Sequence, residues 1–146
     1  MFFISILFLS QLYSHTQEPK KLLPRSANQL YTFVKENNLT YGYSLYWGAQ
    51  ALAVSWISGW HNIIRPVMFD KKNGSIIFSG RSQTFTYWYN NVHKGRTFIA
   101  IMKDVEECHD LDRCLIGVKH RPGEPDEILT HKDMTFYIYK NGIFIK

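Results

Sequence analysis

The stretch from Leu39 to Phe69 constrains the fold more than any other part of the chain. Leu39–Trp47 is rich in residues that favour strands, and residues 48–59 are small or apolar on almost every side, which is typical of a buried helix ending at Gly59. A second strand is expected at Asn62–Phe69, where Pro66 cannot donate to a ladder and therefore indicates an edge, a bulge or a strand end. This order predicts a β-α-β unit.

A helix is expected before this unit. Ser26 followed by Gln29 has the pattern of a capping box, and Leu30, Phe33 and Val34 fall on one helical face before the Asn pair at 37–38 stops the helix.

Further strands and one more helix are expected after it. Asn-Gly pairs at 73–74 and 141–142 predict two hairpins, the second between Met134–Tyr139 and Ile143–Ile145. Arg96–Met102 has the pattern of a strand, Asp104 with Glu107 predicts a helix to about Leu115, and residues 119–127 form a loop. We therefore predict an α/β fold, a mixed sheet of about five to six strands with helices packed against it.

The N-terminal residues 1–13 are almost entirely apolar. They match the apolar core of a signal peptide, although no basic residue precedes them. They match equally well the distal half of a membrane helix that starts upstream. Residues 14–25 are polar and contain two prolines, so they are interpreted as a linker to a single extracytoplasmic domain at 26–146. We expect a membrane-associated protein facing the extracytoplasmic side.

The charge pattern argues against a nucleic-acid partner. The formal net charge is +5, but no run of Lys or Arg is longer than two, unlike the clustered basic stripe of a nucleic-acid groove. A membrane surface suits the scattered charge better.

The two cysteines, Cys108 and Cys114, leave three interpretations open. In an oxidising compartment they could form a disulfide, they could be two buried or half-buried thiols, or they could bind a metal together with His109 and the neighbouring aspartates, although the spacing matches no known zinc site. Six residues along a helix give about 600° of rotation and about 9 Å of rise, so a disulfide requires a break in the helix. No metal or cofactor is expected.

No catalytic motif for phosphate, dinucleotide, zinc or acyl chemistry occurs in the chain. The best candidate for binding is the segment from Tyr87 to Arg96, which combines aromatic faces with amide, imidazole and cationic donors, as sites for sugars and lipid headgroups do. The alternative is that its rings belong to the core and that residues 90–95 form a solvated turn. The candidate ligand-binding residues are Trp88, Tyr89, Asn90, Asn91, His93 and Arg96, together with Tyr46 and Trp47 at the first strand-to-helix junction.

A family resemblance rests on soft aromatic and aliphatic patterns. These are Thr40–Trp47 entering an apolar helix, Ile63–Val67, the Trp88-Tyr89 pair before Arg96–Ile101, and Phe136–Asn141. From about Leu30 onward the chain resembles the soluble domain that follows the last transmembrane helix in bacterial polytopic membrane proteins of the glycosyltransferase-C type, which include dolichyl-phosphate-mannose mannosyltransferase-like proteins.

The resemblance implies a domain without a catalytic residue, because the acidic residues and the lipid-phosphate-sugar site of that family lie in its membrane part. It implies an accessory or binding domain whose partner is a glycan, a lipid-linked sugar or a membrane protein. An envelope protein-protein interaction module and a small exported enzyme of unknown type are the alternatives.

Overall fold

The sheet is mixed and has six strands in the order β3-β2-β1-β4-β6-β5. The computed structural model describes residues 24–47, 49–70, 72–78, 84–90, 93–103 and 110–143, so the predicted segment 1–13 and almost all of the predicted linker lie outside it. The strands are β1 (Tyr41–Leu45), β2 (Ile63–Phe69), β3 (Ile76–Ile77), β4 (Thr97–Met102), β5 (Glu127–His131) and β6 (Met134–Tyr139). The helices are α2 (Arg25–Glu36), α3 (Ala51–Ile57), α4 (Leu111–His120) and the 3₁₀ turn η2 (Thr86–Tyr89).

The predicted β-α-β unit is confirmed, because β1 and β2 are parallel neighbours connected through α3. β4 lies parallel to β1 on its other side, while β3 and the β6-β5 pair extend the sheet in antiparallel fashion. Pro66 pairs in register with Ser44, and β3 reaches only Met68 and Phe69. No described strand therefore lies beside Pro66 on the side away from β1, as its missing N–H requires.

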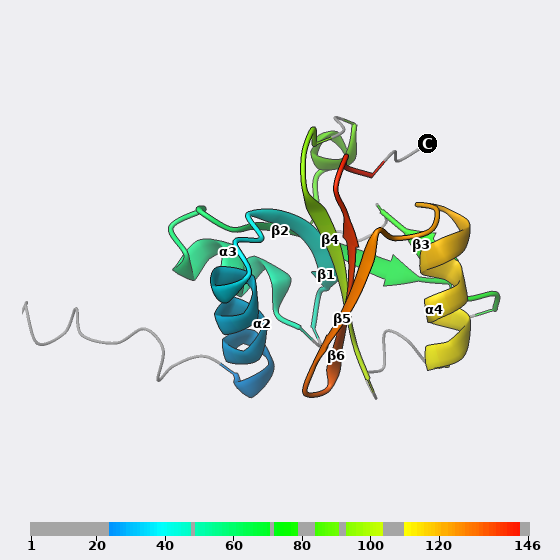
Figure 1. Cartoon of the computed structure of the whole chain (residues 1–146), viewed down its shortest axis with the longest axis horizontal. Helices are drawn as coiled ribbons and strands as arrows, with labels where there is room; N and C mark the ends of the chain where they lie inside the picture. Colours follow the sequence, from blue (N-terminus) through cyan, green and yellow to red (C-terminus); the bar gives the residue numbers. More distant parts are fainter. Residues whose placement is uncertain are drawn as a thin grey trace, which may run out of the picture.

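Helices cover both faces of the sheet (Figure 1), with α2 and α3 on one side and α4 on the other. Strand side chains alternate between the two faces, so β2, β4 and β6 each contribute to two separate cores. The core under α2 and α3 includes Ile64, Phe98, Ala100, Phe136 and Ile138. The core under α4 includes Tyr43, Leu45, Val67, Phe69, Ile99, Ile101, Tyr137 and Tyr139.

Helix α2 buries the predicted stripe of Leu30, Phe33 and Val34. Its start differs from the prediction, because the N-cap is Pro24 and no side chain caps the helix. Gln29 therefore does not form the predicted capping box. It is one of the buried residues of α2. The end is confirmed at the Asn pair, where Asn38 adopts a φ of 52°.

Helix α3 is buried on one side only, so the prediction of an all-round buried helix is wrong. Ala51, Val54 and Ser55 face the sheet, whereas Trp56 is 73% exposed. The Ser55 hydroxyl accepts a hydrogen bond from the backbone N–H of Ile64 at 2.8 Å, which ties α3 to the start of β2. The break at Gly59 is confirmed, with a φ of 61°.

Helix α4 begins later than predicted and runs further. Its N-cap is Asp110, whose carboxylate accepts from the backbone N–H of Arg113 at 3.2 Å, and it ends at His120 rather than near Leu115. Residues 104–109, where the start was predicted, lie outside the described residues. α4 approaches the turn between β2 and β3 so closely that a Cβ on Gly117 would lie 2.7 Å from the carbonyl carbon of Gly74.

Two predicted hairpins have different outcomes. β2 and β3 form a hairpin around Gly74 as predicted, but its turn is longer than two residues, because the Asp70 N–H donates to the Ser75 carbonyl at 2.9 Å. The predicted C-terminal hairpin is wrong in its partner, because β6 lies between β4 and β5 and has no free side for residues 143–145, of which 144 and 145 lie outside the described residues. β5 itself lies where no strand was predicted from the sequence.

Candidate functional site

The Trp88-Tyr89 pair lies in η2, and its two rings have different environments. Tyr89 is only 6% exposed, and its hydroxyl donates to the carbonyl of Pro66 at 2.5 Å. Trp88 is half-buried, with the guanidinium carbon of Arg65 4.4 Å from the ring centroid. Tyr89 therefore belongs to the core and offers no free face for stacking.

Two neighbouring rings are exposed instead. Phe85 is 58% and Tyr87 64% exposed; Phe85 directly precedes η2, and Tyr87 lies in η2 next to Trp88. Their centroids lie 5.5 Å apart, and the Trp88 ring lies 5.3 Å from Phe85 and 6.4 Å from Tyr87. We call Phe85, Tyr87 and Trp88 the aromatic platform. The ligand-binding residues predicted from the segment Tyr87–Arg96 include Trp88 and Tyr89. Trp88 belongs to the platform and Tyr89 is buried, whereas the two most exposed rings of the platform, Phe85 and Tyr87, were not among the predicted residues.

The polar candidates do not all gather at these rings. Arg96 donates to the carbonyl of Asn37 at 3.0 Å and pairs with Glu127 at 3.3 Å, so it joins the start of β4 to α2 and the edge strand β5. His93 stacks on Tyr41 with centroids 4.2 Å apart and an interplanar angle of 6°. Asn90 is exposed directly after η2. Asn91 lies outside the described residues.

Tyr46 and Trp47 form a separate pair directly after the carboxyl end of β1. Their rings meet edge to face at 4.7 Å, and Trp47 is exposed. The Gln50 amide donates to the Trp47 carbonyl at 2.9 Å and orders the turn into α3.

Buried tyrosines line the core next to Arg65. Burial, reinforced by the neighbouring Tyr41, raises the pKa of Tyr43 far above its usual range. Burial also raises the pKa of Tyr89 to about 12, against the smaller lowering effects of Thr84 and Arg65. Both phenols therefore stay protonated at neutral pH and act as hydrogen-bond donors rather than bases.

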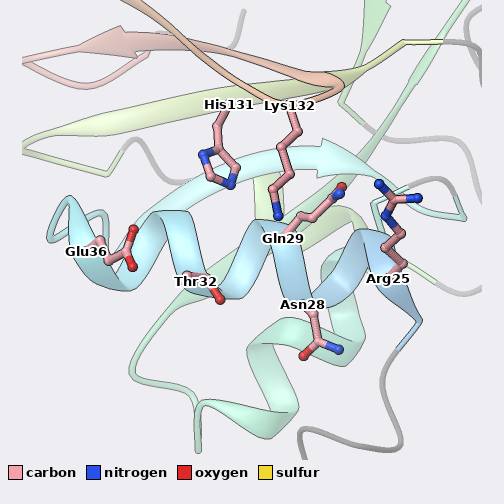
Figure 2. Close-up of a pocket in the computed structure, with 7 residues that line it drawn as sticks. All are labelled: Arg25, Asn28, Gln29, Thr32, Glu36, His131 and Lys132. Atoms are coloured by element: carbon pink, nitrogen blue, oxygen red, sulfur yellow. The ribbon is translucent and has the colours of Figure 1, made fainter.

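The structure contains a cavity of about 470 Å³ that sequence reasoning missed (Figure 2). It lies between α2 and the turn from β5 to β6. A hydrogen bond of 2.8 Å from the Lys103 N–H to the Asp133 carbonyl joins that turn to the carboxyl end of β4. Seven of the described residues line it: Arg25, Asn28, Gln29, Thr32, Glu36, His131 and Lys132. The only sequence signal was a Gln on the otherwise apolar face of α2.

Gln29 is the unusual member of this lining. It is 5% exposed, and neither its Nε2 nor its Oε1 has a hydrogen-bond partner. Figure 2 shows its side chain rising from α2 toward the strand turn that carries Lys132. A buried amide without partners is strongly unfavourable unless something else satisfies it.

Cys114 is buried on α4 and is disulfide-bonded. Cys108, its predicted partner, lies outside the described residues, so the pairing itself stays a prediction. Asp110 has an extended backbone, with a φ of −137° and a ψ of 104°, and thus separates position 108 from the helix that carries Cys114. This is the break that a disulfide between the two positions requires.

Within the described ranges, no three His, Cys, Asp or Glu residues are grouped so that they could hold a metal ion. The helices in the same ranges are all too short or too polar to cross a bilayer. Comparison of the whole chain with protein-family models, curated proteins and solved structures gave no match.

Proposed function

We propose that this chain is a non-catalytic binding domain of a membrane glycosyltransferase-like system in the cell envelope, and that it holds a glycan or a lipid-linked sugar on the aromatic platform. The exposure of Phe85 and Tyr87, 58% and 64%, carries the proposal. Large aromatic side chains contribute most to stability when they are buried, so two adjacent exposed rings serve a contact with something outside the chain.

The core and the backbone of the turn hold the platform in place. Tyr89, one turn position beyond Trp88, is anchored in the core by its hydrogen bond to Pro66. The N–H of Trp88 donates to the carbonyl of Phe85 at 2.9 Å, which closes the turn that presents the rings. A binding surface whose rings are already ordered loses little conformational entropy when a ligand arrives.

The chemistry of the platform suits a sugar. The flat faces of Phe85 and Tyr87 can stack on the C–H face of a pyranose ring, and the exposed amide of Asn90 follows directly and can donate to a hydroxyl. The cation of Arg65 holds the Trp88 ring at 4.4 Å and leaves the more exposed rings for the ligand.

The cellular setting of the proposal comes from the sequence. The apolar segment 1–13 supports membrane association with this domain on the extracytoplasmic side. The resemblance to the soluble domain of glycosyltransferase-C type proteins supports a role beside a sugar-transfer site. In this role the domain holds an acceptor while another protein performs the chemistry.

Paired binding and stability measurements test the proposal. Wild type and the variants Phe85→Ala and Tyr87→Ala are titrated with bacterial envelope oligosaccharides, with thermal melts in parallel. Each lost ring contact is worth about 0.5–1.5 kcal/mol, so we expect about 2- to 10-fold weaker binding, while stability changes by less than about 0.5 kcal/mol.

Trp56→Ala is the matched control, because it removes an exposed ring of α3 that is outside the platform. It should leave sugar binding unchanged. If no oligosaccharide binds the wild type, or if Trp56→Ala weakens binding as much as Tyr87→Ala, the platform is not a sugar site and the proposal fails.

A further inference from the structure

The cavity between α2 and the β5-β6 turn combines three residues that are each unfavourable for folding. Gln29 is buried with its amide unpartnered. Arg25 places a cation in the first turn of α2, where the helix dipole favours an anion and no acidic residue is present. Lys132 adopts a φ of 55°, a conformation that glycine and asparagine tolerate best.

Such exceptions to local preference are expected at functional sites, where a ligand compensates for them. Here all three line one cavity, although they come from two distant parts of the chain. Figure 2 shows Gln29 and Lys132 extending toward each other across it, with Arg25 at one end and Glu36 at the other.

The lining defines the chemistry of a ligand. Among the described residues, no carboxylate forms an ion pair with Arg25 or Lys132, so an anionic group can bind near both cations. The Gln29 amide has two N–H donors and a carbonyl acceptor to satisfy, which requires a ligand that both accepts and donates. Thr32 and Glu36 add hydroxyl and carboxylate groups suited to ligand hydroxyls.

We infer that this cavity binds a small polyol that carries one anionic group, of the class of a sugar acid or a sugar phosphate. A volume of about 470 Å³ lies in the range of small-molecule sites and has room for a single sugar unit. The inference does not depend on the aromatic platform, with which the cavity shares no residue.

Calorimetric titration of the full chain in mild detergent tests this inference. The probes are D-glucuronate and glucose 1-phosphate, with glucose, acetate and inorganic phosphate as comparisons. We expect one or both anionic sugars to bind at least about tenfold more tightly than all three comparisons, and the stronger of the two identifies the anionic group. Equal binding of glucose, equally tight binding of acetate or phosphate, or no binding by any probe would overturn the inference.

Two variants separate a ligand role from a structural one. Gln29→Met keeps the side-chain length and removes the unpartnered amide, so it should weaken binding at least about tenfold while raising the melting temperature of the ligand-free protein. Lys132→Asn removes the cation at an exposed turn that asparagine tolerates, and it should also weaken binding. A fall in melting temperature for Gln29→Met, or unchanged binding for Lys132→Asn, would contradict the inference.

Matched controls exist for both variants. Gln50→Met changes a glutamine whose amide already donates to the Trp47 carbonyl. Lys140→Asn changes an exposed lysine in the turn that follows β6. Both should bind the anionic sugar as the wild type does. Tyr87→Ala should also leave this titration unchanged, so failure of the cavity and failure of the platform can be told apart.

Discussion

Replacing Gly117 by alanine tests whether α4 is held against the sheet by direct contact between backbones. Gly117 lies inside α4, where alanine is favoured over glycine by about 1 kcal/mol. Against this, an added Cβ would lie 2.7 Å from the carbonyl carbon of Gly74 and 3.1 Å from the Cα of Ser75. Both neighbours are backbone atoms of a turn and cannot rotate away as a flexible side chain could.

The contact should outweigh the gain in helix propensity. Overpacking costs about 1–3 kcal/mol, and the upper part of that range, about 2–3 kcal/mol, applies here because α4 must also move away from the core that Cys114 and Val118 fill. We therefore expect Gly117→Ala to lower the free energy of unfolding by about 1–2 kcal/mol, measured by urea denaturation with tryptophan fluorescence.

Ile116→Ala is the control for this experiment. Ile116 is the neighbouring residue of α4 and is exposed, so its truncation changes helix propensity without touching the turn. Its effect should stay within about 0.5 kcal/mol. A Gly117→Ala protein as stable as the wild type would refute the close approach of α4 to Gly74.

Three further results are expected. First, the contribution of the buried tyrosines to the free energy of unfolding should be fully present below pH 10 and should be lost as the pH rises toward about 12. The reason is that burial raises the pKa of Tyr89 from 10.0 to about 12 and that of Tyr43 further; urea denaturation across this pH range checks it. Second, a disulfide between Cys108 and Cys114 should make the unreduced protein about 2 Da lighter than the reduced protein by mass spectrometry, and equal masses would exclude it. Third, removing residues 1–22 should leave a protein that unfolds cooperatively, because the polar linker with its two prolines separates the apolar segment from the rest of the sequence; an aggregated product would show that the apolar segment contributes to folding.

The central part of the fold could be predicted because its sequence pattern is strong. β1, α3 and β2 alternate between β-formers and small residues, and Gly59 ends the helix region with a positive φ. β5 could not be predicted in the same way. It is an edge strand whose residues are mostly exposed, so no apolar alternation marks it, and the turn that follows it contains Lys132 rather than glycine.

The C-terminal hairpin was mispredicted for a related reason. Asn141-Gly142 is a strong turn signal, but Gly142 instead allows the chain to pass close to the carbonyl of His93. The start of α4 was mispredicted because the prediction used Asp104 as the cap, whereas the structure uses Asp110, a residue of the same capping type.

The candidate sites show the limits of sequence patterns more clearly. The aromatic segment was recognisable, but whether Tyr87 or Tyr89 faces outward depends on the 3₁₀ geometry of η2, which places Tyr89 over Pro66. The cavity was beyond sequence reasoning because Gln29 and Lys132 come together only through the packing of α2 against the β5-β6 turn.

The central position of β1 has a consequence for how the protein is made. β1 and α3 are synthesised early, but β1 pairs with β4, and the Ser44 hydroxyl donates to the carbonyl of Ala100, 56 residues later, at 2.9 Å. Phe98 and Phe136, which complete the core under α2 and α3, also come late. A nascent chain that ends before β4 thus exposes the apolar face of β1 and β2. The sheet can form only after the last third of the chain has been synthesised, and the long loop closure makes folding slow.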